Sequence, residues 1–270
     1  MIELAVIGAG NMAEAIVRSA LAEKVLRPAQ VVAADLSAAR RELFSSQLGI
    51  PSHEHARDAA VGAKCILLSV KPQHMPAVLA ELSGVLDPSC LVISIAAGIS
   101  SRYIEAQLGS GNPWRVVRVM PNTPMLAGCG MAALSAGAHA GIADLAAARR
   151  LFEAGAKIIE LPEDKMDAVT AISGSGPAYF FYLVELMVQA GVEMGLSPDD
   201  AHLLATQTAL GAAKMMTAGG DLPAELRRKV TSPGGTTIEG VHELEKGNFR
   251  GAVISAVRSA AAKSRQLGQG

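Results

Sequence analysis

A glycine-rich segment near the N-terminus, Gly8-Ala9-Gly10-Asn11-Met12-Ala13, has the residue types that bind a dinucleotide. It follows a short apolar run and precedes a helical pattern that extends to about Glu23. In this context the first glycine permits a tight turn, and the second allows the backbone to approach a pyrophosphate. The phosphates would lie against free N–H groups at the positive end of the helix dipole. We therefore predict that this segment binds a nicotinamide dinucleotide.

Asp35 ends the second apolar run of the chain. An acidic residue at this position hydrogen-bonds the adenosine ribose hydroxyls and favours NAD. Ser37, Arg40 and Arg41 follow closely, however, and could hold the 2′-phosphate of NADP. Asp35 could alternatively cap the next helix. These residues leave the choice between NADH and NADPH open.

Three further loops follow apolar runs and would lie at the same edge of a parallel sheet. Two of them are Ser69-Val70-Lys71-Pro72 and Ile95-Ala96-Ala97-Gly98, whose small residues would let a nicotinamide ribose approach the backbone. A single lysine such as Lys71 is more often a solvated surface residue. The third is Val119–Pro124, which contains Pro121-Asn122 and by itself resembles an extended loop.

A second glycine-rich segment, Thr231-Ser232-Pro233-Gly234-Gly235-Thr236-Thr237, precedes a helical pattern in the last part of the chain. Its glycines leave backbone N–H groups accessible, and hydroxyl side chains flank them. Such a segment can bind a carboxylate or a phosphate, with a simple helix cap as the alternative. Ser173–Pro177 is also glycine-rich, and it is typical of a turn between two helices.

No residues have the spacing of a metal site or of a nucleophile with its general base. His53 and His55 are close together in a polar stretch, and the other histidines are dispersed. The three cysteines form no CxxC pair. Because Cys65 and Cys90 begin apolar runs, we expect them to be buried and reduced. The prediction is that the protein has no metal site.

Short apolar runs alternate with helix-length segments as far as residue 162, which indicates a βαβ series and a mostly parallel sheet. The first four runs are continuously apolar, as in strands covered on both faces. The expected strands are Leu4–Ile7, Val31–Ala34, Cys65–Val70, Leu91–Ile95 and, with weaker patterns, Arg115–Val119, Gly130–Leu134 and Lys157–Leu161.

The pattern becomes helical after Pro162, so we expect a Rossmann-type α/β domain over residues 1–162 and an all-helical domain over 163–270. Helices are expected near 178–194, 198–218, 222–230 and 247–267. Several of them carry apolar or small residues on more than one face, which favours burial against another subunit. A compact monomeric bundle is the alternative.

The composition sets limits on the function. The 270 residues are 50% hydrophobic and have a formal net charge of −1, which argues against nucleic acid or an anionic membrane as a partner. The N-terminal residues lack the pattern of a targeting peptide, and the longest apolar stretches are well under the ~20 residues that span a bilayer. We therefore expect a cytoplasmic protein.

Together these segments resemble pyrroline-5-carboxylate reductase, the last enzyme of proline synthesis. The resemblance covers nearly the whole chain, and its last two pieces are the most specific. The matching pieces are VIGAGNMAEAI, SVKPQ, SIAAGIS, VVRVMPNTP, AISGSGPAYFFYLVELM and VTSPGGTTIEGVHELEKGNFRGAVISAV.

The resemblance implies NAD(P)H-dependent reduction of L-1-pyrroline-5-carboxylate to L-proline, with NADPH slightly favoured over NADH. It also implies a Rossmann domain, a helical dimerisation domain, interlocked subunits and, in some members, a decamer. The implied phosphate-loop residues are Ile7, Gly8, Ala9, Gly10, Asn11 and Met12. The implied nicotinamide-side residues are Ser69, Val70, Lys71, Pro72, Ala96, Ala97, Pro121 and Asn122. The implied substrate-carboxylate residues are Ser232, Gly234, Gly235, Thr236 and Thr237, contributed across the dimer interface.

The same resemblance places the hydroxyl of Thr237 near the substrate nitrogen as the catalytic group. One departure concerns adenosine recognition, because the stretch His53–Arg57 lacks an asparagine that many relatives carry there. Reduction of a cyclic imine needs a hydride donor and a proton that water can supply, so no strong general acid is expected.

Two other functions are consistent with the elements. A β-hydroxyacid dehydrogenase would need a base, typically a lysine, on the helix that begins near Pro177, and residues 177–183 contain none. A dinucleotide-sensing protein without activity would not need the hydroxyl-rich loop at 231–237.

Overall fold

The computed structural model describes residues 2–109 and 111–268, and these divide into two compact units. The first unit contains the chain up to Ser175 together with the end of the chain from Ser259 onward. The second unit is Gly176–Arg258. The division therefore lies later than the boundary expected after residue 162, and the chain returns to the first unit at its end.

Side-chain contacts explain why the segment after residue 162 belongs to the first unit. The carboxylate of Glu163 accepts hydrogen bonds from the Ser101 N–H, at 2.8 Å, and the Ser101 hydroxyl, at 2.6 Å. Arg118 adds an ion pair at 2.9 Å. Near the end of the chain, the hydroxyl of Ser264 donates to Asp167 at 2.6 Å. These contacts join residues that are distant in the sequence.

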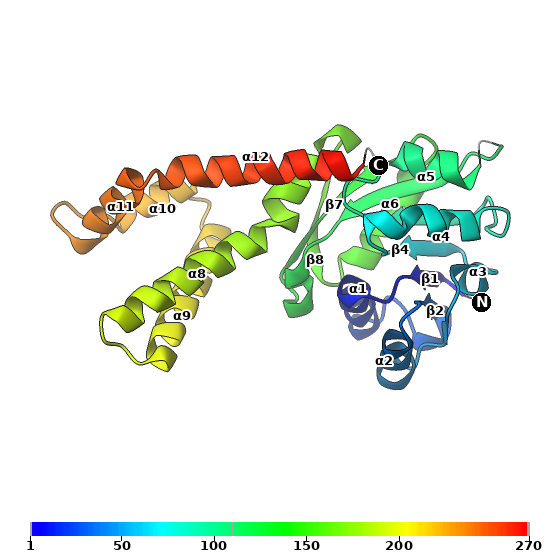
Figure 1. The fold of residues 1–270 in the computed structure, drawn as a ribbon, viewed down its shortest axis with the longest axis horizontal. Helices are drawn as coiled ribbons and strands as arrows, with labels where there is room; N and C mark the ends of the chain where they lie inside the picture. Colours follow the sequence, from blue (N-terminus) through cyan, green and yellow to red (C-terminus); the bar gives the residue numbers. More distant parts are fainter. Residues whose placement is uncertain (1, 110, 269–270) are drawn as a thin grey trace. The chain divides into compact units, whose positions relative to one another are not determined.

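The first unit is built on an eight-stranded sheet with the order β3-β2-β1-β4-β5-β6-β7-β8. Figure 1 labels β1, β2, β4, β7 and β8 of this sheet. Strands β1 to β6 are parallel, β7 is antiparallel to β6, and β8 is parallel to β7. The mostly parallel sheet that the sequence predicts is confirmed. The strands are β1 (Leu4–Ile7), β2 (Val31–Ala34), β3 (Ser52–His53), β4 (Cys65–Leu68), β5 (Leu91–Ser94), β6 (Arg115–Met120), β7 (Gly130–Ala136) and β8 (Ala156–Glu160).

Helices cover both faces of this sheet, which accounts for the continuously apolar strands. One core contains Val6, Ala33 and Leu67 and packs against α1 (Asn11–Ala22), α2 (Ala38–Leu48) and α6 (Ile142–Phe152). The alternate residues of the same strands, including Ile7, form the other core with α3 (Ala56–Ala60), α4 (Met75–Leu82) and α5 (Ser101–Leu108). Each of these strands is therefore buried on both sides.

All the expected strands are present, with ends shifted by one or two residues. Sequence reasoning missed β3, which has only two residues and a partly exposed pattern. The cysteines are free; Cys90 is buried as expected, whereas Cys65 is only half-buried and Cys129 is exposed.

The second unit is helical, as expected. A π-helical turn at Thr170–Gly174 precedes α8, and Ser197 caps α9 by accepting a hydrogen bond from the Asp200 N–H at 3.1 Å. The helices are α8 (Gly176–Glu193), α9 (Pro198–Ala218), α10 (Pro223–Lys229), α11 (Thr236–Lys246) and α12 (Phe249–Leu267), whose end lies in the first unit.

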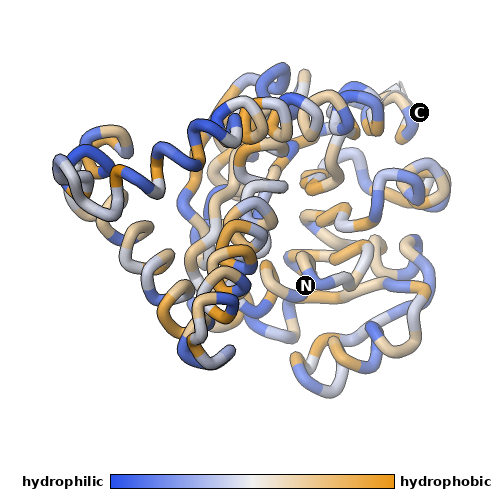
Figure 2. Tube along the Cα trace, turned by 60° about the vertical axis from the view of Figure 1, so that its left-hand side comes forward, coloured by the Kyte–Doolittle hydropathy of each residue, from blue (hydrophilic) through white to orange (hydrophobic). Residues whose placement is uncertain are grey.

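Many large apolar side chains of the second unit are exposed. In α8, Phe180 is 62% and Phe181 is 67% exposed, and in α9, Leu203 is 66% exposed. Hydrophobic positions recur along the helices of this unit (Figure 2). Exposed apolar surface of this extent marks a region that associates with another protein surface.

Candidate functional site

The turn between β1 and α1 has the geometry expected of a dinucleotide-binding loop. Gly8 has a φ of +94°, and a Cβ there would lie 2.8 Å from the Ser69 carbonyl oxygen. The turn therefore requires glycine at position 8. Gly10 precedes α1 with a φ of −71°, and a Cβ there would meet nothing within 4 Å. The space beside the first N–H groups of α1 is open, so this loop fits a pyrophosphate.

A cavity of about 460 Å³ lies at the carboxyl edge of β1, β2 and β4, beside this turn. In doubly wound sheets, ligands bind at this edge, where the direction of strand order reverses. Seven of the predicted cofactor residues line the cavity, namely Ile7, Gly8, Gly10, Asp35, Ser69, Val70 and Lys71. The structure thus brings together three loops that are separate in the sequence.

Asp35 is held in place by backbone donors. Its carboxylate accepts a hydrogen bond from the Ala9 N–H at 2.7 Å and another from the Ser37 N–H at 2.8 Å. The first of these bonds joins the end of β2 to the glycine-rich turn. The residue that precedes α2 in the N-cap position is Ser37. The alternative that Asp35 caps this helix is therefore wrong.

The two arginines near Asp35 are engaged with groups of the protein. Arg40 forms an ion pair with Glu14 at 2.8 Å and donates to the carbonyl oxygen of Ala9. Arg41 donates to the carbonyl oxygens of Asp35, at 2.8 Å, and Leu36, at 2.9 Å. Both side chains thereby tie α2 to the loops around the cavity.

Glu14 accepts hydrogen bonds from two arginines. Partial burial alone would raise the pKa of Glu14, but hydrogen bonds from Arg18 and Arg40 outweigh this and lower it. The carboxylate is therefore charged at neutral pH, and its pair with Arg40 persists there.

The other predicted cofactor residues do not line this cavity. Ala9 and Ala96 are buried, Ala97 and Met12 are half-buried, and Asn11 is exposed. Pro72 is half-buried and Pro121 is buried. All of them lie at or beside the carboxyl ends of β1, β4, β5 and β6.

The side chain of Asn122 joins separate segments of the first unit. Its side-chain amide donates to the Ser173 carbonyl oxygen at 3.1 Å and accepts from the Met131 N–H at 2.8 Å. These bonds fix the loop after β6 against the π-helical turn and the start of β7. The buried amide thus has one donor and one acceptor contact within the chain and keeps a second N–H.

The cavity is also lined by residues that the sequence did not predict as site residues, namely Ala34, Leu36, Glu54, Ala56, His74, Ala77, Val78 and Glu81. Glu81 lies on α4, and its carboxylate accepts from the Ala56 N–H, at the start of α3, at 2.8 Å. A carboxylate at a helix N-terminus is stabilised there by the free N–H groups and the helix dipole. Because this contact joins two helices, no local pattern in the sequence indicates it.

The predicted substrate loop lies in the second unit. Gly234 has a φ of +69°, a conformation that favours glycine, and Gly235 precedes α11 with a φ of −86°. The three hydroxyl residues Ser232, Thr236 and Thr237 are exposed. The loop therefore presents accessible hydroxyls at the N-terminus of an eleven-residue helix. The structure assigns the predicted cofactor and substrate residues to different units.

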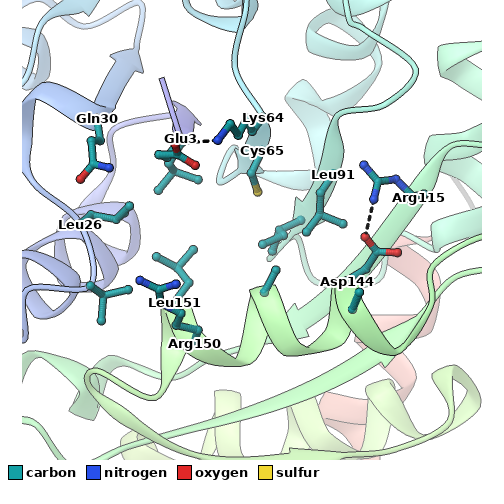
Figure 3. A pocket seen from close by; sticks show the side chains of 15 residues that line it. Glu3, Leu26, Gln30, Lys64, Cys65, Leu91, Arg115, Asp144, Arg150 and Leu151 are labelled. Atoms are coloured by element: carbon teal, nitrogen blue, oxygen red, sulfur yellow. Dashed lines mark hydrogen bonds and ion pairs between the residues drawn. The ribbon is translucent and has the colours of Figure 1, made fainter. Parts of the chain in front are cut away.

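A second cavity, of about 580 Å³, lies at the opposite edge of the sheet, where β1, β4, β5 and β6 begin (Figure 3). Its charged residues are largely paired: Lys64 lies 2.9 Å from Glu3, and Arg115 lies 2.8 Å from Asp144. It contains none of the predicted site residues. Since ligands of this fold bind at the carboxyl edge, the smaller cavity is the candidate site.

The described part of the chain holds no group of three or more histidine, cysteine, aspartate or glutamate residues placed to hold a metal ion. Within the same residues, no helix has the length and apolar character needed to cross a membrane.

Comparison with known proteins identifies the family. Residues 163–267 match the family model described as pyrroline-5-carboxylate reductase dimerisation, and residues 3–98 match that of NADP oxidoreductase, coenzyme F420-dependent. The chain is 42% identical over 269 residues to a pyrroline-5-carboxylate reductase of Synechocystis sp., covering 99% of both chains. The chain belongs to the pyrroline-5-carboxylate reductase family. A relative from Pseudomonas aeruginosa is also 42% identical, over 98% of this chain and 97% of that protein.

Solved structures of this family have the same fold. The pyrroline-5-carboxylate reductase of Coxiella burnetii superimposes with a TM-score of 0.88 at 34% identity, over 98% of each chain. The pyrroline carboxylate reductase of Plasmodium falciparum, solved with NADP bound, has a TM-score of 0.89 at 30% identity over 99% of this chain and 98% of that one. The resemblance inferred from the motifs is confirmed over both units, so the two other functions weighed from the sequence are set aside.

Proposed function

We propose that this chain reduces L-1-pyrroline-5-carboxylate to L-proline with NAD(P)H, the final step of proline biosynthesis. The observation that carries the proposal is the open helix N-terminus beside the Gly8 turn, at the carboxyl edge of a doubly wound sheet. Membership of the pyrroline-5-carboxylate reductase family over nearly the whole chain supports the substrate and the reaction.

Residues of the first unit would hold the dinucleotide, which supplies the hydride when bound. The first N–H groups of α1 would bind the pyrophosphate, and the loop Ser69–Lys71 would lie on the nicotinamide side. Ala96, Ala97, Pro121 and Asn122 remain predicted contributors on that side. The buried turn and its contacts with β4 would keep these groups in fixed positions, which reduces the reorganisation that binding requires.

The loop at 231–237 would bind the substrate. N–H groups of Gly234 and Thr236 would hold its carboxylate, with Ser232 as a further donor, and the dipole of α11 would favour the negative charge. The Gly235 N–H donates to the Ser232 carbonyl oxygen at 3.1 Å, so Gly235 would shape the loop around the carboxylate. The hydroxyl of Thr237 would orient the imine nitrogen. A cyclic imine takes its proton from water near neutral pH, so the chain has to position the substrate rather than supply a strong acid.

We further propose that the active form is a homodimer. The family model that matches residues 163–267 describes a dimerisation domain, and the exposed apolar side chains of α8 and α9 suit a helical partner surface. In this proposal the helical units interlock, and each substrate loop serves the active site of the partner subunit. A decamer of such dimers and a cytoplasmic location also stay predictions, with no nucleic acid or membrane as partner.

The reaction is tested by following NAD(P)H oxidation with pyrroline-5-carboxylate. Turnover with this substrate and not with 3-hydroxy acids is expected. Activity only with a hydroxy acid, or with neither substrate, would contradict the proposal.

The role of Thr237 is tested with a pair of variants. Thr237→Ala should lower kcat by about 100-fold, a typical effect of losing one positioning donor, with little change in dinucleotide affinity. Thr237→Ser retains the hydroxyl and should keep most of the activity. If Thr237→Ala turns over at the wild-type rate, Thr237 has no part in the mechanism.

A further inference from the structure

The end of β2 presents a carboxylate at the adenosine side of the candidate cofactor site. Asp35 lines the cavity, and its two oxygens each accept one backbone N–H, from Ala9 at 2.7 Å and from Ser37 at 2.8 Å. Each carboxylate oxygen can accept more than one hydrogen bond. Asp35 therefore keeps acceptor capacity for the hydroxyls of a ribose while the backbone fixes its orientation.

The cations that could neutralise a 2′-phosphate at this position have other partners. Arg40 pairs with Glu14 at 2.8 Å and donates to the Ala9 carbonyl oxygen. Arg41 donates to the carbonyl oxygens of Asp35 and Leu36. These bonds use part of the five N–H donors of each guanidinium and hold both side chains against protein oxygens, and the Glu14 carboxylate offsets the charge of Arg40. A guanidinium that gave up these bonds to turn towards a phosphate would leave a carboxylate or carbonyl oxygen without its donor.

Other charges near Asp35 are also unfavourable to a phosphate. Glu54 and Glu81 line the same cavity. Glu54 lies 3.6 Å from Arg41 and offsets part of its charge. The cavity's basic residues, Lys71 and His74, follow β4, which pairs with β1 on the side opposite β2. A 2′-phosphate beside Asp35 would therefore meet carboxylates, with the nearest guanidiniums already paired.

We propose that this chain prefers NADH to NADPH, and that Asp35 is the residue that discriminates between them. The inference rests on the dinucleotide site of the proposed function and specifies its cofactor. It departs from the slight preference for NADPH that the family resemblance suggests. The Plasmodium falciparum relative was solved with NADP bound, but it shares only 30% of its residues with this chain.

Binding without substrate tests the inference independently of the reaction. Titration of the full-length protein with NADH and NADPH in a calorimeter should give a dissociation constant at least about tenfold lower for NADH. A tenfold ratio corresponds to about 1.4 kcal/mol, within the range expected for a like-charge contact in a partly exposed site. Equal affinities, or tighter binding of NADPH, would overturn the inference.

Two variants assign the discrimination to Asp35. Asp35→Asn keeps an oxygen that can accept the Ala9 N–H but removes the charge, and should tighten NADPH binding by about tenfold while weakening NADH. The control, Glu42→Gln, removes the same charge from an exposed position on α2 that does not line the cavity. Glu42→Gln should leave both affinities unchanged.

The outcomes separate this inference from the proposed reaction. If Asp35→Asn does not change the ratio, or Glu42→Gln changes it equally, Asp35 is not the discriminating residue. If neither dinucleotide binds, the cofactor site itself is wrong. If NADH binds preferentially but pyrroline-5-carboxylate is not reduced, the proposed reaction fails while the cofactor inference stands.

Discussion

Replacing Gly98 by alanine would test the contact between the loop after β5 and the end of α12. Gly98 has a φ of +78°, and a Cβ at this position would collide with the carbonyl oxygen of Ser264. It would also lie 2.9 Å from the Cβ of Leu267. The atoms that it meets belong to the last turns of α12, which Ser264 also anchors through its hydrogen bond to Asp167.

The expected loss of stability has two parts. A residue with a Cβ in the left-handed region costs about 1–2 kcal/mol. The collision with a backbone oxygen and a packed side chain costs about 1–3 kcal/mol more, as overpacking does elsewhere. Gly98→Ala should therefore lower the free energy of unfolding by about 2–5 kcal/mol, a large part of the usual 5–15 kcal/mol.

Gly84→Ala is the matched control. Gly84 has a φ of +80°, and a Cβ there would meet nothing within 4 Å. Both variants have the same backbone strain and the same effect on the unfolded chain, so their difference isolates the contact with α12. Gly98→Ala should unfold about 2–12 °C below Gly84→Ala, from about 2–4 °C per kcal/mol for a chain of this size.

Calorimetric thermal unfolding measures this difference, and amide hydrogen exchange locates it. Peptides that cover residues 259–268 should lose protection in Gly98→Ala and keep it in Gly84→Ala. Because Ala96 and Ala97 precede Gly98 in the predicted nicotinamide-side loop, kcat/KM should also fall in Gly98→Ala alone. Equal melting temperatures together with unchanged exchange at 259–268 would refute the reasoning.

The half-buried carboxylate of Glu163 and the buried thiol of Cys90 give two further predictions. Burial alone would raise the pKa of Glu163, but the hydrogen bonds from Ser101 and Arg118 outweigh this effect and lower the pKa. A lowered folded-state pKa means that this stabilisation is complete above the unfolded-state value and is lost as the pH falls through the folded-state value. Glu163→Gln should lower the free energy of unfolding at pH 7 by about 2–3 kcal/mol. In urea titrations at several pH values, the variant should also lose less stability than the wild type as the pH falls. An equal loss of stability at every pH would contradict this role of the Glu163 carboxylate. Burial raises the pKa of the Cys90 thiol to about 12, so at pH 8 a thiol reagent should react rapidly with exposed Cys129 and only slowly with Cys90. Equally rapid reaction of Cys90 in the native protein would contradict this burial.

Much of the fold was predictable because its signals are local. Strands buried on both faces are continuously apolar, so β1, β2, β4 and β5 stand out in the sequence. Ser197 followed by Pro198 marks the start of α9, because a side-chain cap and a proline suit the first turn. By contrast, β3 has two residues and no apolar pattern, so only its pairing with β2 defines it.

The candidate site was predictable only in part, for the same reason. The glycine-rich turn is a contiguous motif, and the structure gives Gly8 the positive φ that the motif requires. Glu81 was missed because it enters the cavity through a hydrogen bond between helices. The stretch 163–175 was expected in the helical domain, but the bonds of Glu163 join it to the first unit.

The sequence by itself determined the Rossmann-type sheet, the helical second part, the glycine-rich turn between β1 and α1 and the family. These depend on residue types and their spacing along the chain. Only the tertiary structure decided how the charges around Asp35 are paired. In the sequence, Asp35 is consistent with binding of NADH and Arg40 with binding of NADPH. The structure shows that the Ala9 N–H donates to Asp35 and that Arg40 pairs with Glu14. Such pairings join residues far apart in the sequence, so their geometry exists only after the chain has folded.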